Sequence, residues 1–424
     1  MPAVHRECEV SHFVAICPEV PGHANSMSAL LLELQSRGHR ITWIGVPDGQ
    51  SLVEPWGFDS VIVGEDVFPL GYMASAKAQL GKLTGWAAVR FTVEQYQRAI
   101  EVGLRDMPRV LRQTQADLIL ADESAFHVRS LADQLDMPWV SVASALPMHP
   151  DPDLPPAGLP WAYGRSVYHR MRNRVGRSMV RLVMRKIFRA IADYRSEHGL
   201  SQYDFLQGNA SRLATLAQIT RKFDFPRREI SDWFHYVGSL HQADHRPAVP
   251  FPFDQLDTRP LIYASMGTLQ NRLHGVFYDI AVACADVDCQ LVVSLGGGCQ
   301  PSDVGDLPGQ PMVVEYAPQL ELIKRASLVV THAGMNTVTE SIAAGVPMLA
   351  IPVTNDQPAI GARIARAGCG LTIPVHRASP RNIRAAVNRL LSDARVQQKA
   401  REQAVANADA GGLRRAIQIV ERCL

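Results

Sequence analysis

Short runs of apolar, mostly β-branched residues alternate along the chain with helix-length segments and polar turns. Such runs have the length and composition of buried parallel strands, whose two faces are both covered. The predicted strands are residues 11–18, 41–46, 117–121, 138–143, 234–237, 261–265, 289–295, 312–316, 327–331, 348–353 and 371–374. Strands that alternate with helices in this way predict an α/β fold with parallel sheets.

A segment rich in proline and charge divides these strands into two sets. Residues 241–258 have the composition of a linker, and a chain of 424 residues is longer than one ordinary core. We therefore expect two Rossmann-like domains, residues 1–240 and residues 259–424. No GxGxxG motif follows the first strand, so the pattern does not favour a nicotinamide-dependent dehydrogenase.

Polar residues gather in the turns of one stretch, residues 311–357. The strand at 327–331 stops at a small, hydroxyl-rich turn, residues 332–337, which opens a helix. Backbone N–H groups and the helix dipole at such a turn favour a phosphate. Glu340 lies one helical turn after Asn336, where a carboxylate suits the two hydroxyls of a ribose.

Three further positions in this stretch extend the predicted site beyond phosphate and ribose. Tyr316, at the end of its strand, offers an aromatic face for a base. Asp356 and Gln357 follow the strand at 348–353 and carry groups suited to sugar hydroxyls. Base, ribose, phosphate and sugar groups in this order describe a nucleotide-sugar site.

The same stretch resembles the nucleotide-sugar signature of the family-one UDP-glycosyltransferases. The matching residues are Tyr316, Pro318, Gln319, His332, Gly334, Asn336, Thr337, Glu340, Gly345, Val346, Pro347, Asp356 and Gln357. Plant members carry Trp where Tyr316 stands, and their interval between the positions of Gln319 and His332 is slightly longer.

The resemblance implies a fold and a set of donor-binding residues. The fold is GT-B, in which two Rossmann-like domains face a cleft and the last helix returns to the N-terminal domain. The expected donor-binding residues are Gly267, Thr268, Tyr316, Gln319, His332, Gly334, Asn336, Thr337, Glu340, Asp356 and Gln357.

Two residues of the N-terminal half suit the chemistry of sugar transfer, which needs a base for the acceptor proton. His23 lies in the turn after the first strand, at a helix start that favours neutral imidazole. Asp122 ends a strand and would hold the second ring nitrogen. The resemblance implies the same roles. Alternatively, His23 is a solvated or capping residue, Asp122 is a helix cap, or Glu123 takes its place.

The chain also contains two Asp-x-Asp sequences of the kind that hold a metal in the other glycosyltransferase fold. Asp151 and Asp153 lie in a proline-rich loop, and Asp286 and Asp288 precede a strand, away from any phosphate turn. We therefore expect no metal and no cofactor beyond UDP-glucose as co-substrate. The family resemblance implies direct displacement with inversion of the anomeric configuration.

The acceptor is suggested by similarity outside the donor stretch. Residues 11–18, 141–155, 223–240, 262–270 and 331–338 are similar to bacterial carotenoid (zeaxanthin) glucosyltransferases. The sequence thus predicts transfer of glucose to a hydroxyl of a hydrophobic acceptor such as zeaxanthin. An alternative acceptor is a flavonoid, macrolide or phenol, and galactose or a deoxysugar is an alternative to the favoured glucose. A UDP-N-acetylglucosamine epimerase and a non-catalytic nucleotide-binding partner of a second enzyme remain open alternatives.

Charge adds one further feature, because the net charge is only +2 but its distribution is uneven. No acidic residue occurs in residues 154–192, whereas nine basic residues do. The segment 165–189 reads as an amphipathic basic helix, with Arg177, Arg181, Arg185 and Arg189 on one stripe. Such a helix would contact anionic lipid at the inner face of a membrane, or be a solvated outer helix. Nucleic acid is a poorer partner, since no aromatic platform accompanies the arginines.

The cysteines and the first residues of the sequence bear on the cellular compartment of the protein. The seven cysteines are scattered singly, without a CxxC pair, and the chain does not open with a secretory pattern. Both features predict a cytoplasmic protein with reduced thiols.

Overall fold

The computed structural model describes residues 10–80, 83, 85–149, 151–241, 248–267, 274–297 and 299–424. The N-terminal half forms a sheet of seven parallel strands in the order β3-β2-β1-β4-β5-β6-β7. Its strands are β1 (His12–Ile16), β2 (Arg40–Gly45), β3 (Asp59–Ile62), β4 (Leu118–Asp122), β5 (Trp139–Ala143), β6 (Ala214–Ala217) and β7 (Phe234–Tyr236).

The C-terminal half forms a second sheet of six parallel strands in the order β10-β9-β8-β11-β12-β13. Its strands are β8 (Leu261–Ser265), β9 (Gln290–Ser294), β10 (Met312–Val314), β11 (Leu328–Thr331), β12 (Met348–Ala350) and β13 (Gly370–Thr372). The predicted α/β class and the two parallel sheets are therefore confirmed, while the exact domain boundaries stay a prediction.

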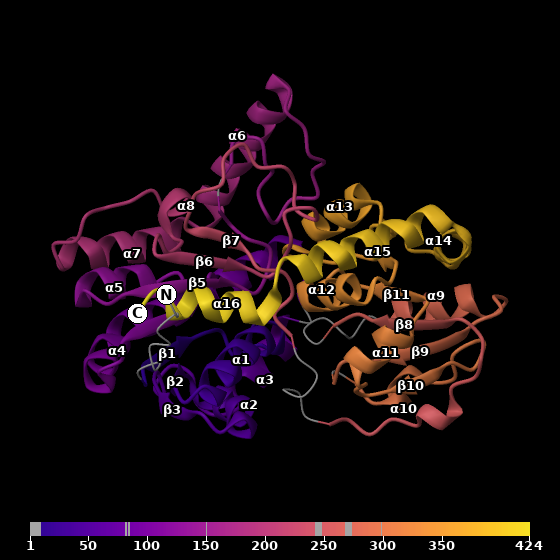
Figure 1. Cartoon of the computed structure of the whole chain (residues 1–424), viewed down its shortest axis with the longest axis horizontal. Helices are drawn as coiled ribbons and strands as arrows, with labels where there is room; N and C mark the ends of the chain where they lie inside the picture. Colours follow the sequence, from indigo (N-terminus) through magenta and orange to yellow (C-terminus); the bar gives the residue numbers. More distant parts are fainter. Residues whose placement is uncertain are drawn as a thin grey trace, which may run out of the picture.

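Helices connect the strands within each half (Figure 1). In the N-terminal half they are α1 (Pro21–Ser36), α2 (Gln50–Val53), α3 (Tyr72–Leu80), α4 (Gly85–Thr114), α5 (Val128–Leu135), α6 (Val167–Val183), α7 (Arg185–Glu197) and α8 (Phe205–Gly208). In the C-terminal half they are α9 (His274–Cys284), α10 (Pro301–Val304), α11 (Gln319–Arg325), α12 (Met335–Ala344), α13 (Gln357–Ala367), α14 (Pro380–Ser392), α15 (Ala394–Asp409) and α16 (Gly412–Glu421).

Strand β1 shows why its sequence is an unbroken apolar run. Phe13 and Ala15 are buried in one core with residues of α1 and α16. Val14 and Ile16 are buried in the other core, with residues of α4 and α5. Successive side chains of a strand point to opposite faces, so a sheet covered on both sides needs apolar residues at every position.

The last helix belongs to the core of the first half. Ala416, Ile417 and Val420 of α16 are buried together with residues of α1, and the amide of Gly412 donates to the carbonyl of Val237 at 2.7 Å. Figure 1 shows this C-terminal helix lying beside the N-terminal sheet. The predicted return of the last helix to the first domain is confirmed.

The single basic helix expected in residues 165–189 is wrong. The chain forms two helices there, α6 and α7, separated at Met184. The predicted arginine stripe is consequently divided between them. Ile187 and Ile191 of α7 are buried in the same core as Val14 and Ile16, so α7 is an ordinary packed helix. No glycine or proline marks the break, which explains why the sequence pattern did not reveal it. Among the described residues, no helix is both long and apolar enough to cross a bilayer.

Candidate active site

The order of the strands predicts where each half can build a site. In both sheets the chain runs outward in two directions from a central pair, which is β1 and β4 in the first sheet and β8 and β11 in the second. Loops that leave such a pair diverge to opposite sides and open a crevice at the carboxyl ends of the strands. The residues predicted for catalysis and for phosphate binding follow these four strands.

His23 and Asp122 meet at the first of these positions. His23 lies in the first turn of α1, which begins with Pro21, and Asp122 is the last residue of β4. Nδ1 of His23 lies 3.0 Å from Oδ2 of Asp122. The aspartate side chain is 1% exposed and the imidazole 20% exposed. The pair predicted from distant parts of the sequence is therefore formed, with the histidine on the accessible side.

A second set of bonds fixes the aspartate. Oδ1 of Asp122 accepts a hydrogen bond from the amide of Ser124 at 2.9 Å and another from its hydroxyl. With both carboxylate oxygens engaged, Asp122 is held as an acceptor toward His23. Glu123, the alternative partner, accepts instead from the amide of Met148 at 3.0 Å. Burial raises the pKa of Glu123 to about 7.

The two pKa values of the pair move apart. Burial alone would lower the pKa of His23, but the charge and hydrogen bond of Asp122, together with the charge of Asp356, raise it overall. Burial alone would raise the pKa of Asp122, but His23 and the hydrogen bonds from Ser124 lower it. The expectation that the helix start favours neutral imidazole is thus wrong in its net direction, because the carboxylates of Asp122 and Asp356 outweigh the effect of burial.

The phosphate turn of the second half has different chemistry. His332 follows β11 and lies against Gly267, which follows β8; a Cβ on Gly267 would come within 2.6 Å of the His332 Nε2 atom. Burial lowers the pKa of His332 to about 4, so the ring is neutral. Gly334 caps α12 without a side-chain hydrogen bond, which leaves the first N–H groups of this helix available to an anion. Thr268 lies outside the described residues.

Three predicted donor-binding residues form one hydrogen-bonded group beside this turn. Nε2 of Gln319, at the start of α11, donates to Oε2 of Glu340 at 2.6 Å and lies 3.4 Å from the Thr337 hydroxyl. The hydroxyl of Tyr263 donates to Oε1 of Gln319 at 3.1 Å. This fixes the amide of Gln319 and leaves the buried Glu340 carboxylate in a defined position.

Tyr316 and Gly297 lie together at the edge of the second sheet. The Tyr316 side chain is 52% exposed, and a Cβ on Gly297 would overlap its hydroxyl. Gly297 also has a positive φ of 73°, so a residue without a side chain is required there. An exposed aromatic ring at this position agrees with the predicted platform for a base.

Asp356 and Gln357 lie at the start of α13, and Asp356 reaches the first half. Oδ2 of Asp356 accepts from the amide of Leu146, in the loop after β5, at 3.2 Å. Oε1 of Gln357 accepts from the amides of Val353 and Thr354 at 2.9 and 3.0 Å. The side chain of Gln357 is therefore bonded to the turn that precedes α13. Because its charge also acts on His23, Asp356 lies near the predicted pair of His23 and Asp122.

Asn336 makes a second connection between the halves. Its Nδ2 donates to the carbonyl of Gly22 at 2.8 Å. Its Oδ1 lies 2.9 Å from the hydroxyl of Ser26 and 3.2 Å from Nε2 of Gln218. Asn336 and Glu340 were expected to serve one ligand from one helix face, but in this structure Asn336 bonds toward α1 and Glu340 bonds toward α11.

The sequence profile of the family described as UDP-glucoronosyl and UDP-glucosyl transferase matches residues 102–404. The chain belongs to this family. Over 423 residues it is 32% identical to the zeaxanthin glucosyltransferase of Pantoea ananas, covering 98% of this chain and 96% of that protein. It is 28% identical over 436 residues to the zeaxanthin glucosyltransferase of Pseudescherichia vulneris, covering 98% of both.

A solved structure supports the fold of this glycosyltransferase. The crystal structure of CalG4, the calicheamicin glycosyltransferase, matches with a TM-score of 0.75 and 23% identity over 98% of each chain. The predicted GT-B fold is confirmed by this match.

Three residues near the site of this glycosyltransferase were not found from the sequence. Ser26 lies three residues after His23 on the same helix, so helical spacing could have identified it. Gln218 directly follows β6, a strand that the apolar pattern did not reveal. Tyr96 of α4 has its pKa raised to about 12, by burial and then by the charges of Asp122 and Asp356. Nothing in the local pattern of a long helix indicates this position.

Three carboxylates of the two Asp-x-Asp sequences, those of Asp151, Asp153 and Asp286, have hydrogen-bond or ion-pair partners within the chain. Asp151 accepts from the amides of Asp153 and Arg228. Asp153 pairs with Arg170 at 2.7 Å, and Asp286 pairs with Arg384 at 2.9 Å. These carboxylates stabilise loops and helix ends in the described structure.

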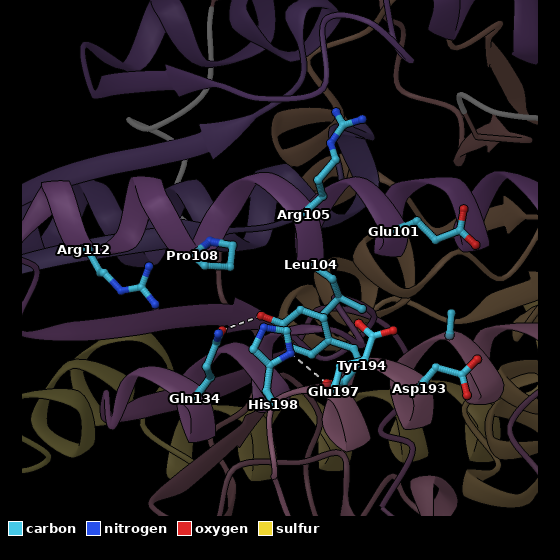
Figure 2. Close-up of a pocket in the computed structure, with 11 residues that line it drawn as sticks. Glu101, Leu104, Arg105, Pro108, Arg112, Gln134, Asp193, Tyr194, Glu197 and His198 are labelled. Atoms are coloured by element: carbon cyan, nitrogen blue, oxygen red, sulfur yellow. Dashed lines mark hydrogen bonds between the residues drawn. The ribbon is translucent and has the colours of Figure 1, made fainter.

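A surface hollow of about 650 Å³ lies apart from these residues, between α4, α5 and α7 (Figure 2). Tyr194 donates to Gln134 on its wall, and the ring of His198 stacks on Tyr194 with 4.1 Å between centroids. None of the predicted site residues lines it. This hollow is therefore separate from the predicted site residues at the carboxyl ends of the two sheets.

Proposed function

We propose that this glycosyltransferase moves glucose from UDP-glucose to a hydroxyl group of a lipophilic acceptor, with a carotenoid diol such as zeaxanthin as the first candidate. The names of the two relatives described above support this acceptor. UDP-glucose is supported by the match to the UDP-glycosyltransferase family.

His23 acts as the general base in this proposal. The acceptor oxygen attacks the anomeric carbon while the bond from that carbon to the UDP oxygen breaks. His23 takes the hydroxyl proton, and the charge of Asp122 stabilises the imidazolium that forms. The new bond forms opposite the leaving group, so an α-linked donor gives a β-glycoside. The products are the glucoside and UDP, and the proton on His23 then passes to solvent.

The donor is bound by groups of the second half. The N-terminal N–H groups of α12 and the neutral ring of His332 stabilise the charge that develops on the departing phosphate. Glu340, held by Gln319, accepts from the ribose hydroxyls, and Tyr316 stacks on the base. Asp356 and Gln357 bind the glucose hydroxyls. In this proposal the helix dipole and these donors replace a metal ion.

One observation carries the proposal. The hydrogen-bonded pair of His23 and Asp122 lies close enough to Asp356 for its charge to raise the pKa of His23. A base from one half thus lies beside a predicted sugar-binding carboxylate from the other. This is the arrangement needed when a proton is removed from an acceptor as it attacks a sugar.

The test is acceptor-dependent release of UDP from UDP-glucose. The acceptors are zeaxanthin, a flavonoid, a macrolide and a simple phenol, each assayed with wild type and with His23→Ala. UDP-galactose and dTDP-glucose replace the donor in parallel, and addition of EDTA tests the metal requirement. We expect release with a lipophilic alcohol, its loss in the variant, and a β-linked product by NMR. Release that is equal with and without every acceptor would overturn the proposal.

A further inference from the structure

Helix α6 carries an apolar face that the described part of the protein does not cover. Six large apolar side chains on this helix are between 51% and 71% exposed: Val167, Tyr168, Met171, Val175, Met179 and Leu182. From Tyr168 onward they are spaced by three or four residues, and all six lie on one side of the helix, over roughly a third of its circumference. Figure 1 shows α6 projecting away from both sheets.

The opposite side of α6 attaches the helix to the first half. Asn173 and Gly176 are buried there, and a Cβ on Gly176 would lie 2.6 Å from the ring of Trp161. The Nδ2 of Asn173 donates to the carbonyl of Pro152 at 3.3 Å. The orientation of the helix is therefore fixed by packing, and its apolar side is turned outward.

Arginines border this apolar face. Arg172 lies next to it, stacks over Trp161 at 4.9 Å and donates to the Ala162 carbonyl. Arg174, on the other border, is exposed and has no ion pair with any described residue. Arg181 is 45% exposed although it pairs with Asp204. Because residues 154–192 contain no acidic side chain, the whole helix presents positive charge around an apolar centre.

We propose that α6 docks this protein on the surface of a lipid bilayer that contains anionic head groups. The helix would lie in the plane of the interface, with its apolar face at the boundary of the acyl chains and its arginines at the phosphates. The stripe of four arginines expected from the sequence is not this surface, since α7 buries its apolar side. The surface is the outward face of α6.

A lipid surface fits this face better than the two other candidates. A second copy joined by a two-fold axis would bring the same arginines of both copies together, and like charges repel. A nucleic acid would meet the positive charge but leave the apolar centre without a partner. A bilayer offers phosphates at its surface and hydrocarbon below them. The phosphates suit the arginines of α6, and the hydrocarbon suits its apolar face.

The proposal extends the proposed function but does not rest on it. An acceptor as apolar as a carotenoid resides in membranes, and a docked enzyme would meet it there. His23 and Asp122 lie on other elements, at the ends of β1 and β4, so lipid binding can be measured without donor or acceptor. Failure of one proposal therefore leaves the other testable.

The test is flotation of the full-length protein with vesicles of phosphatidylcholine, alone or with a quarter of phosphatidylglycerol. Wild type is compared with the triple variant Met171→Ser, Val175→Ser and Met179→Ser. The matched control is the triple variant Leu213→Ser, Tyr278→Ser and Val405→Ser, three exposed apolar positions on other elements. We expect binding to the anionic vesicles that falls at least about tenfold in the α6 variant and persists in the control.

Charge is tested separately with Arg174→Gln, which should weaken binding to the anionic vesicles roughly fivefold. Binding should also decrease as salt is added. Circular dichroism and activity on a water-soluble acceptor check that each variant is folded. Wild type that stays unbound, or an α6 variant that floats like the control, overturns the proposal. So does light scattering that finds a dimer dissociated by the α6 substitutions, because a second copy would then cover this face.

Discussion

The two predicted sites lie at equivalent positions of the two sheets but differ in their ionisable groups. At the ends of β1 and β4 the first half holds two ionisable groups, His23 and Asp122, whose pKa values are shifted in opposite directions. At the ends of β8 and β11 the second half holds a glycine turn, a helix start and the neutral ring of His332. In the proposed function, the same arrangement of strands thus serves proton transfer in one half and anion binding in the other.

The difference follows from what each site has to do in the proposed reaction. A base changes its protonation during each turnover, so its pKa has to be set by nearby charges. A site for a diphosphate has to keep the same charge throughout, which backbone N–H groups and a neutral imidazole do at any pH near neutrality. Substitutions in the first half should therefore change kcat, and those in the second half should change donor affinity.

The largest expected effect is that of His23→Ala. Removal of the proposed base should lower kcat about 10³- to 10⁴-fold and leave the Kd for UDP unchanged, because we propose that the other half binds the nucleotide. UDP-release assays give kcat and calorimetry gives Kd. The matched control is His376→Ala, an exposed histidine of the second half, which should match wild type. A kcat within tenfold of wild type would remove His23 from the mechanism.

The next effect is that of Asp122→Asn, which keeps the shape of the side chain but removes its charge. We expect kcat to fall about 10²-fold or more, because the imidazolium loses its stabilising partner and the ring loses its defined tautomer. Glu123→Gln is the control for the same change one residue away and should cost less than threefold in kcat. Equal losses in the two variants would show that Asp122 has no special role.

A smaller effect, now on affinity, is expected from Glu340→Gln in the second half. The buried carboxylate is replaced by an amide that accepts ribose hydroxyls less well, so the Kd for UDP should rise about tenfold. The value of kcat at saturating donor should stay within about twofold of wild type. Calorimetry with UDP measures the first and UDP release the second. The control is Glu321→Gln, at an exposed position on α11, which should leave both kcat and Kd unchanged. A lower kcat with unchanged Kd in Glu340→Gln would contradict the claim that the second half sets donor affinity and not kcat.

The smallest effect concerns the contact between the halves. Ser26→Ala removes one hydrogen bond to Asn336 and should lower kcat/KM about two- to fivefold without changing the Kd for UDP. Ser28→Ala, on the same helix, removes a bond to the local carbonyl of Asn25 and serves as control. If both variants keep the kcat/KM of wild type, the bridge through Asn336 does not influence the reaction.

The two halves also differ in how far the sequence predicted them. The predicted donor residues from Tyr316 to Gln357 lie within one short stretch, so their order along the chain is nearly their order in space. The strands around them are buried on both faces, which makes their apolar runs easy to recognise. This is why the sheet of the second half and the position of its phosphate turn were predicted.

The first half depends on contacts between distant segments. The pair of His23 and Asp122 could be predicted because parallel strands present their carboxyl ends at one edge of a sheet. Gln218 was missed because β6, with the sequence Ala-Thr-Leu-Ala, is built mostly from small residues and does not form a β-branched apolar run. Tyr96 was missed because its position depends on how a long helix packs. The direction of the His23 pKa was missed because the charge and hydrogen bond of Asp122, with a smaller contribution from Asp356, outweigh the effect of burial.

The most direct test of the account is the pH dependence of kcat/KM in wild type and in Asp122→Asn. The base has to be neutral, so activity should rise with pH as His23 loses its proton. Because carboxylates raise the pKa of His23, the midpoint in wild type should lie above the usual value of about 6.5. In the variant, burial dominates and the midpoint should move to lower pH, although the plateau is lower. Identical midpoints in the two proteins would contradict the claim that Asp122 sets the pKa of the catalytic base.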